Sequence, residues 1–186
     1  YPFAFDHQWG FLTASYGWLP FQSDLGAGCM EKDEAGMVRF TGNVTIDGGK
    51  GHDTIDSYGD DAVIYDNNGV NRINSYGDNA LIYGGTGRLN LHVTGNASTV
   101  VGSQGRNGIL ATASNSLIDC GKSDDYILLE NARNTTINTA DGNDTLWSVK
   151  TANIIFNGGA GDDYIDTFET GHATLLGGAG NDRSEE

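Results

Sequence analysis

The chain has 186 residues, which is enough for one well-buried domain and short for two. Its 25 acidic and 10 basic residues give a formal net charge of -15, so phosphate backbones and anionic lipid headgroups are repelled and cations are the expected partners. No apolar run approaches the roughly 18 residues that a membrane helix needs. We therefore expect neither nucleic-acid binding nor membrane insertion.

The first 43 residues are rich in aromatic side chains and lack the repeat that fills the rest of the chain. Eight of the first 21 residues are aromatic: Tyr1, Phe3, Phe5, Trp9, Phe11, Tyr16, Trp18 and Phe21. The open end of a stack of repeats exposes unpaired strand edges and apolar side chains, which need a cover. We predict an aromatic-rich cap over 1–43, with a docking segment for another subunit or domain as the alternative.

Residues 44–186 repeat with a period of 18. The segment DTIDSYGDDAVIY, which starts at Asp53, matches NRINSYGDNALIY, which starts at Asn71. In this register two apolar columns emerge, and all fifteen of their members are aliphatic except Phe156. The first column contains Ile46, Ile64, Ile82, Val100, Ile118, Ile137, Phe156 and Leu175, and the second contains Ile55, Ile73, Leu91, Ile109, Ile127, Leu146 and Ile165.

Each period predicts two short strands, one per column, with a turn after each strand. Small residues two positions from a column member point to the same side of a strand, as Ala62, Ala80, Ser57 and Ser75 do. The pattern predicts an all-β fold, a flattened β-solenoid of about seven to eight coils with 18–19 residues each. At about 4.8 Å per coil the rod is roughly 35 Å long.

The two turns of each period differ in how they tolerate insertion. From the first column to the second the spacing is always nine residues, as in Ile46 to Ile55. In the reverse direction it is nine as far as Ile118 and ten afterwards, as from Ile127 to Ile137. A turn of fixed length has a fixed backbone geometry, which is what a bound ion would impose.

The invariant turns resemble a known calcium-binding repeat. The segments GGKGHDTID from Gly48, GGAGDDYID from Gly158 and GGAGND from Gly177 are similar to the nonapeptide GGxGxDxUx of the RTX family, the hemolysin-type calcium-binding repeats. The resemblance covers Val44 to Asp182 on alternate turns. It implies a right-handed parallel β-roll, calcium in the turns, secretion and an extracellular or cell-surface location. The opposite turns depart from the motif and are not expected to hold calcium.

The residue chemistry agrees with calcium, which takes about six to eight hard oxygen ligands. Successive glycines permit positive φ and can aim carbonyl oxygens into the turn, while the aspartate at the sixth position adds a carboxylate. An ion between two stacked turns needs aspartates on adjacent coils. The candidate carboxylate ligands are Asp125, Asp144, Asp163 and Asp182, and the candidate backbone ligands are the carbonyl oxygens of Gly158, Ala160, Gly177 and Ala179.

Asp53 is an isolated candidate ligand, because the equivalent residues of the next three coils are Asn71, Leu89 and Asn107. Leu89 cannot ligate a metal. We therefore expect the coils over 62–117 to hold no ion, with hydrogen-bond ladders through the two asparagines instead. The competing interpretation of all these turns is an ordinary string of tight turns, which also favours Gly, Asn and Asp.

The sequence predicts a binding or structural protein and no catalytic residues. The histidines, His7, His52, His92 and His172, are scattered without a nucleophile motif, and the clustered carboxylates are already explained as ligands. We predict a secreted calcium-binding β-roll with a structural or assembly role, such as a filament, surface-layer or adhesin component that self-associates through the N-terminal cap and the open C-terminal end. The alternative is a calcium-dependent folding or secretion module of a larger extracellular enzyme or toxin.

Two further features concern aromatic and thiol side chains. Exposed tyrosines are expected to stack in pairs through cross-strand packing, with a carbohydrate-binding stripe as the alternative: Tyr58, Tyr65, Tyr76 and Tyr83. Cys120 takes the first position of a turn, where glycine is common, so we expect its side chain near the surface edge. Cys29 lies in the 1–43 segment, and two free thiols are expected, with an internal or intermolecular disulfide as alternatives.

Overall fold

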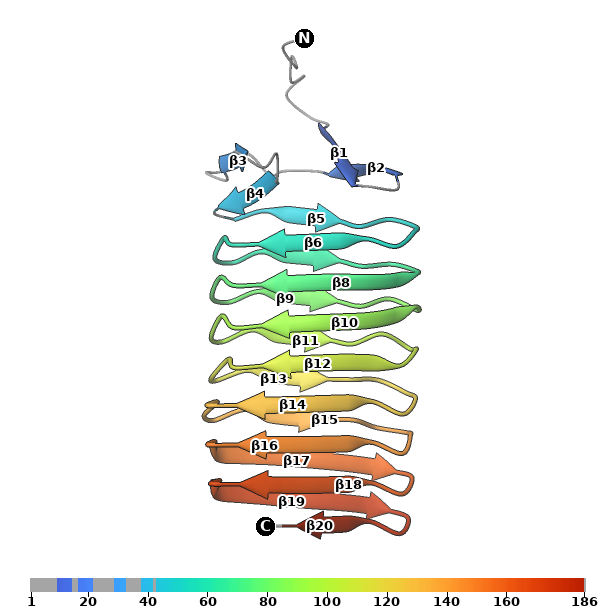
Figure 1. Ribbon diagram of the computed structural model, residues 1–186, viewed down its shortest axis with the longest axis vertical. Helices are drawn as coiled ribbons and strands as arrows, with labels where there is room; N and C mark the ends of the chain where they lie inside the picture. Colours follow the sequence, from blue (N-terminus) through green and yellow to red (C-terminus); the bar gives the residue numbers. More distant parts are fainter. Residues whose placement is uncertain (1–9, 15–16, 22–28, 33–37, 42, 186) are drawn as a thin grey trace.

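The computed structural model describes residues 10–14, 17–21, 29–32, 38–41 and 43–185. These residues form an all-β parallel solenoid of about eight coils, and none of them lies in a helix (Figure 1). The predicted fold class is therefore confirmed. Each coil contributes one strand to each of two sheets that face one another across a narrow interior.

The two sheets run the length of the rod. The ten-stranded sheet contains, in spatial order, β20 (Arg183–Glu185), β18 (Tyr164–Phe168), β16 (Thr145–Val149), β14 (Tyr126–Glu130), β12 (Asn107–Ala111), β10 (Arg88–Val93), β8 (Val70–Ser75), β6 (Thr54–Ser57), β4 (Val38–Thr41) and β3 (Cys29–Lys32). The eight-stranded sheet contains β19 (Gly171–Ala179), β17 (Ala152–Ala160), β15 (Thr136–Asn138), β13 (Leu117–Asp119), β11 (Thr99–Val101), β9 (Leu81–Tyr83), β7 (Val63–Tyr65) and β5 (Thr45–Asp47).

The register of both sheets follows the sequence period. Neighbouring strands from β4 to β20 pair in parallel, so Ile64 lies opposite Ile82, and Ile137 lies opposite Phe156. Both predicted apolar columns point into the interior, where every member is buried except Leu175, which is partly buried at the last coil. Burial of each large aliphatic side chain contributes about 1.5–3 kcal/mol, and every coil needs its neighbours to bury it.

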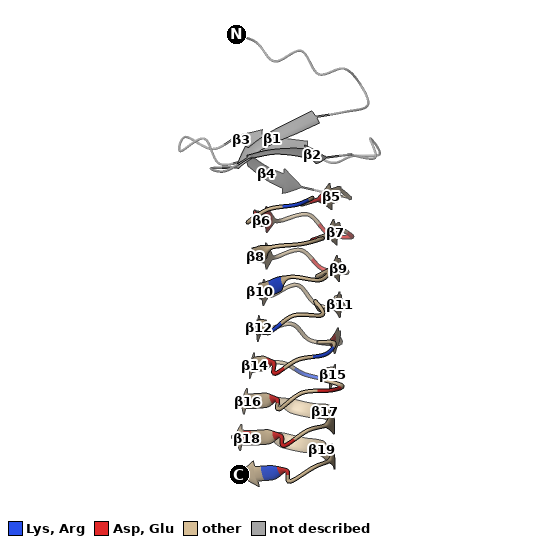
Figure 2. Cartoon of the chain, turned by 90° about the vertical axis from the view of Figure 1, so that its right-hand side faces the viewer, with Lys and Arg blue, Asp and Glu red and all other residues tan. Residues whose placement is uncertain are grey.

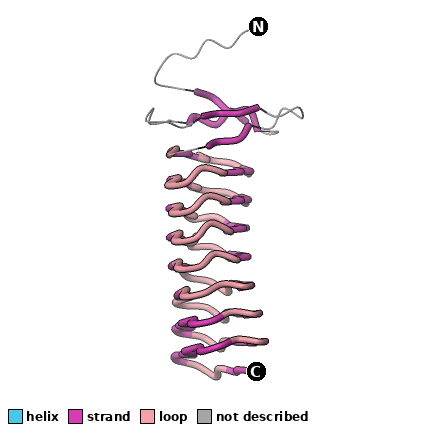
Figure 3. Tube along the Cα trace, turned by 90° about the vertical axis from the view of Figure 1, so that its left-hand side faces the viewer, coloured by secondary structure: helices cyan, strands magenta, loops and turns pink. Residues whose placement is uncertain are grey.

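The opposite turns, which face the viewer in Figure 3, explain why one side of the solenoid accepts insertions. Each nine-residue connection has a single residue in the left-handed region: Asp61, Asn79, Ala97 and Asn115. Each ten-residue connection has two: Asn131 with Asn134, Lys150 with Asn153, and Glu169 with His172. All these φ values lie between 49° and 59°. The extra residue is absorbed by a second left-handed step, so the strands keep their register.

The N-terminal segment extends the solenoid at one end. Strand β4 joins the ten-stranded sheet through the pairing of Phe40 with Ser57, and β3 adds to it in the antiparallel direction. Strands β1 (Gly10–Ala14) and β2 (Gly17–Phe21) form a separate antiparallel hairpin. Tyr1, Phe3, Phe5, Trp9 and Tyr16 lie outside the described residues. The aromatic cap over 1–43 therefore stays a prediction.

The structure confirms the predicted stacking of the tyrosines but not the predicted exposure of Cys120. The rings of Tyr58 and Tyr76 stack with centroids 4.6 Å apart, and those of Tyr65 and Tyr83 with centroids 5.1 Å apart, which confirms cross-strand packing. The expected position of Cys120 is wrong. Its thiol is free but 0% exposed, because the first turn position points into the solenoid and not toward its edge.

Close stacking of the coils leaves no room for a side chain at some glycines and leaves room for one at others. A Cβ at Gly87 would overlap the backbone of Gly69 in the preceding coil. At Gly108, on the outer face of β12, a Cβ would meet only the Asn90 Oδ1, at 3.4 Å.

We predict that Gly87→Ala lowers the free energy of unfolding by about 1–3 kcal/mol through overpacking. Gly108→Ala should raise it by about 0.5 kcal/mol, since glycine weakens a strand interior. Urea unfolding of both variants in the same buffer measures the difference. Equal stabilities would contradict the coil-to-coil contact.

Candidate metal centre

The glycine-rich turns lie on the right-hand side of Figure 1 and face the viewer in Figure 2. They comprise residues 48–53, 66–71, 84–89, 102–107, 120–125, 139–144, 158–163 and 177–182, which we number as the turns of coils 1 to 8. The sixth residue of each turn forms an inward column. Asp125, Asp144 and Asp163 are buried there on adjacent coils, whereas Asp182 is exposed at the last coil. The structure thus brings the predicted carboxylates together.

A hydrogen-bond ladder connects the sixth positions. The backbone N–H of Asp125 donates to Asp144 Oδ1 at 2.7 Å, and that of Asp144 donates to Asp163 Oδ1 at 2.9 Å. The backbone N–H of Asp163 likewise donates to Asp182 Oδ1 at 3.1 Å. Each aspartate therefore accepts a hydrogen bond from the coil before it through one carboxylate oxygen.

The second oxygen of each buried aspartate has no partner. Oδ2 of Asp125, Asp144 and Asp163 is inaccessible to solvent and makes no hydrogen bond to the protein. A buried acceptor without a partner costs about 1–3 kcal/mol, and more when it is charged. A bound cation would give these three oxygens a partner.

The electrostatics of the metal-free site oppose ionisation. Burial raises the pKa of Asp125 to about 7 although Asn107 donates hydrogen bonds to it, and the Asp144 charge raises it too. Burial also raises the pKa of Asp144 to about 6, with Asp163 acting in the same direction. The pKa of Asp163 is raised mainly by burial. A cation beside these groups would reverse the effect by stabilising their charged forms.

The backbone of the turns separates coils that carry aspartate from coils that do not. In coils 1, 5, 6, 7 and 8 the second and fourth positions both have positive φ, as in Gly159 (101°) and Gly161 (137°). In coils 2 and 3 only one of the two positions does, and in coil 4 neither does. Ser123 (105°) and Ala140 (67°) adopt this conformation without being glycine, at a cost of about 1–3 kcal/mol each. The turn shape therefore accompanies the sixth-position aspartate.

The first turn position decides how much room each site has. A Cβ at Gly158 would overlap both Asp163 Oδ2 and the carbonyl oxygen of Gly177, so these two oxygens converge on the side that glycine leaves open. Asp182 Oδ2 occupies the same place beside Gly177. In coils 5 and 6 the first position is Cys120 and Thr139, whose side chains lie inside the turn. The most open set of oxygens is therefore between coils 7 and 8.

Three of the predicted backbone ligands already accept hydrogen bonds. The Ala160 carbonyl accepts the N–H of Gly142, and the Ala179 carbonyl accepts that of Gly161, both at 2.8 Å. The Gly158 carbonyl accepts the Thr139 hydroxyl at 2.8 Å. A carbonyl oxygen has a second lone pair, so these contacts leave each group able to bind a cation.

The sixth-position asparagines of coils 2 and 4 make hydrogen bonds within the protein. Asn107 Nδ2 donates to the carbonyls of Gly105 and Cys120 at 3.0 and 2.8 Å, and Ser103 N–H donates to Asn107 Oδ1 at 2.9 Å. Asn71 Oδ1 accepts the Asp53 N–H at 2.8 Å. The expected asparagine hydrogen bonds are thus present, and buried Leu89 interrupts the ladder between them.

Sequence reasoning missed one buried carboxylate, Asp66, at the first position of the turn in coil 2. It is 1% exposed, and neither of its oxygens has a hydrogen-bond partner. The alignment of the turns singles out this residue, because the column is otherwise Gly, Cys or Thr, but it does not show that the position points inward. Asp53, which is 6% exposed, also has an unpartnered Oδ2. The isolated ligand expected in coil 1 therefore has a carboxylate close by.

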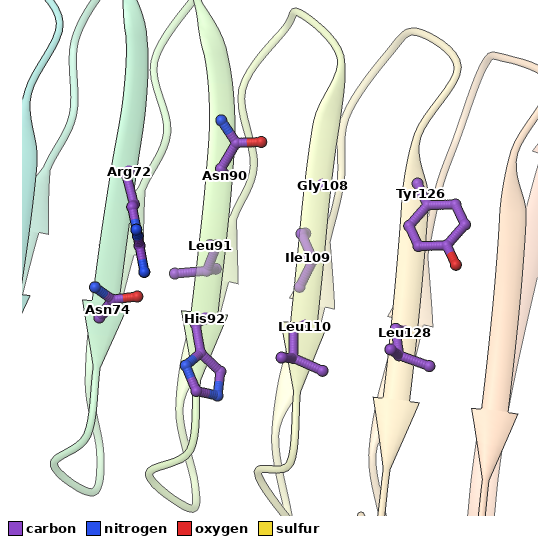
Figure 4. Close-up of a pocket in the computed structure, with 10 residues that line it drawn as sticks. All are labelled: Arg72, Asn74, Asn90, Leu91, His92, Gly108, Ile109, Leu110, Tyr126 and Leu128. Atoms are coloured by element: carbon purple, nitrogen blue, oxygen red, sulfur yellow. The ribbon is translucent and has the colours of Figure 1, made fainter.

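A shallow groove of about 310 Å³ crosses the outer face of the ten-stranded sheet (Figure 4). It exists because Gly108 carries no side chain between Asn90 and Tyr126 on the neighbouring strands. The face-to-face stacking of Tyr58 on Tyr76 directs ring faces along the rod and not toward solvent. This arrangement does not favour a stripe of sugar-binding ring faces.

No protein-family model matches the chain, nor does any curated protein or solved structure. The parallel solenoid is consistent with a β-roll, and the resemblance to RTX repeats rests on the turn sequences. In the part of the chain that is described, no helix has the length and apolarity to cross a membrane. Nor do three or more His, Cys, Asp or Glu side chains there surround a common point, so a cation would also need backbone oxygens.

We predict that the metal-free protein loses stability as the pH rises. The folded-state pKa values of Asp125 and Asp144, about 7 and about 6, lie above the value of about 4 expected on unfolding. The folded state therefore binds more protons than the unfolded state in this window, so the stabilisation is full below pH 4 and lost by about pH 7. Thermal unfolding in metal-free buffer should show a falling midpoint between these values, and Asp125→Asn should flatten the curve. A midpoint that rises over this window would contradict the burial of these groups.

Proposed function

We propose that this chain is a calcium-binding β-roll of the RTX type, in which calcium ions between coils 5 to 8 complete the folding of the rod. The observation that carries the proposal is the run of buried Oδ2 atoms of Asp125, Asp144 and Asp163, which have no partner in the protein. One positive ion between successive coils would pair with each of them.

The donor set favours a hard cation. Carboxylate and carbonyl oxygens are the ligands that calcium prefers, in flexible arrangements of about six to eight. The only sulfur in the turns belongs to Cys120, and burial raises the pKa of that thiol well above its usual value, with Asp125 acting in the same direction. A neutral thiol is a poor ligand, so zinc and other thiophilic metals are disfavoured.

The residues around each candidate site predict an order of calcium affinity. Coils 7 and 8 offer Asp163, Asp182 and the Gly177 carbonyl around a space that two glycines leave open. Between coils 6 and 7 the candidate ligands are Asp144 and Asp163, and the Thr139 hydroxyl lies close enough to Asp144 to offset part of the rise that burial causes in its pKa. Coils 5 and 6 provide Asp125 and Asp144, whose charges act on the buried Cys120 thiol. Affinity should therefore increase toward coil 8.

The biological role that we propose is structural. A rigid rod with two long sheet faces suits a secreted filament, surface-layer or adhesin component at the cell surface, stiffened by extracellular calcium. The second candidate is a calcium-dependent folding module of a larger secreted protein. The solution mass of the full chain at high concentration separates them, because calcium-dependent oligomers support assembly and a strict monomer supports the module.

No catalytic role is included in the proposal. His52 lies at a glycine-rich turn, where its ring contacts the backbone of Val70. His92 lies on the outer sheet face beside Tyr76, and His172 lies at the start of β19, next to an opposite turn. These histidines come from three different parts of the rod and do not form one centre.

The direct test uses two neighbouring aspartates of coil 7. Asp163→Asn keeps the Oδ1 that accepts the Asp144 N–H but removes the buried charge, so calcium affinity should fall about tenfold or more. Asp162→Asn is the matched control: Asp162 is exposed in the same turn, and its Oδ1 accepts the Asn181 N–H. Calorimetric titration of the full chain with calcium chloride measures both. Equal binding by the two variants would show that the inner column does not hold the ion.

A further inference from the structure

Coil 2 departs from the other coils at the first position of its glycine-rich turn. The equivalent residues are Gly, Cys or Thr, but here the inward residue is Asp66. Its side chain is 1% exposed, and both carboxylate oxygens lack a hydrogen-bond partner. No lysine or arginine pairs with it among the described residues. A fully buried carboxylate in this condition is costly unless a positive charge compensates it.

Gly48 in coil 1 lies directly beside this carboxylate. A Cβ at Gly48 would stand 3.4 Å from Asp66 Oδ1, from the Tyr65 carbonyl oxygen and from Ile55 Cδ1, so the missing side chain leaves room for about one methyl group. Asp53 approaches from coil 1 with its own buried, unpartnered Oδ2, and its charge acts on Asp66. Two buried carboxylates with unpartnered oxygens therefore lie on adjacent coils, and the Tyr65 carbonyl oxygen lies on the Gly48 side of Asp66.

This junction is separate from the sites of coils 5 to 8. At the equivalent place in coil 3, a Cβ on Gly84 would stand 2.9 Å from Leu89 Cδ2, so an apolar side chain closes the interior. Coil 4 follows with the hydrogen-bonded Asn107. Neither coil offers a free carboxylate, so binding at one end does not require binding at the other.

We propose that coils 1 and 2 hold a calcium ion between Asp53 and Asp66, with Asp66 as a ligand at a first turn position where the repeat motif has glycine. The two carboxylates supply two negative charges to a divalent ion, and the Tyr65 carbonyl supplies a third oxygen. This site would anchor the end of the rod next to the N-terminal segment. It does not depend on the calcium function proposed for coils 5 to 8.

A competing arrangement is a hydrogen bond between Asp66 and the unpartnered Nδ2 of Asn71, which lies near enough to lower the pKa of Asp66. That arrangement needs no ion and leaves calcium binding unaffected by changes at Asp66. The two interpretations therefore differ in the number of ions that the protein binds.

The experiment counts calcium ions on the full chain by native mass spectrometry and calorimetry with calcium chloride. Asp66→Asn should lower the count by one ion, and so should Gly48→Ala, which fills the space without changing any charge. Asp60→Asn is the matched control, because Asp60 is exposed on an opposite turn. In chelator, Asp66→Asn should raise the thermal midpoint by about 2–4 °C, since a neutral amide replaces an unpaired charge.

The outcomes separate this site from that of coils 5 to 8. If Asp66→Asn and Gly48→Ala bind as many ions as the wild type while Asp163→Asn binds fewer, Asp66 only accepts a hydrogen bond and this inference is wrong. If Asp66→Asn loses an ion and Asp163→Asn loses none, this site stands and the proposed function fails. A wild-type protein that binds no calcium overturns both.

Discussion

The architecture of the glycine-rich edge depends on one repeated hydrogen bond, from the backbone N–H of a sixth turn residue to the side-chain oxygen of the next coil. An aspartate or an asparagine at the sixth position can accept it. In one example the backbone nitrogen of Asp125 lies 2.7 Å from Asp144 Oδ1. In Asp125, Asp144 and Asp163 the bond uses one carboxylate oxygen and leaves the other inside the rod without a partner. The same contact that aligns the coils therefore creates a column of uncompensated charge.

The coils differ in the residue at the sixth turn position and therefore in whether a buried charge is present. Asn107 replaces the second oxygen with an amide nitrogen and donates to surrounding carbonyls, so coil 4 is complete without an ion. Leu89 removes the polar group altogether. Where aspartate remains, the turn adopts two positive φ values, even at Ser123 and Ala140. Coils 5 and 6 therefore keep the turn shape of coils 1, 7 and 8 although one of the two positions is not glycine.

The sequence predicted the fold well because a solenoid is quasi-one-dimensional. The spacing from Ile64 to Ile82 is at once a sequence period and a strand register, so no distant pairing had to be guessed. The inward direction of the first turn position was harder to predict, because glycine has no side chain to reveal it. For that reason the sequence predicts an edge position for Cys120 and assigns no role to Asp66, although both side chains are buried. Their surroundings depend on three-dimensional stacking that periodicity alone does not describe.

The most direct test of the account is amide hydrogen exchange over residues 119–185, with and without calcium. Without the ion, mutual repulsion and unpaired oxygens should leave these amides open to exchange, whereas the coils around Asn107 should be protected in both conditions. Added calcium should protect 119–185 strongly and leave the middle coils unchanged. Equal protection of 119–185 in chelator and in calcium would contradict the claim that a cation completes this edge of the rod.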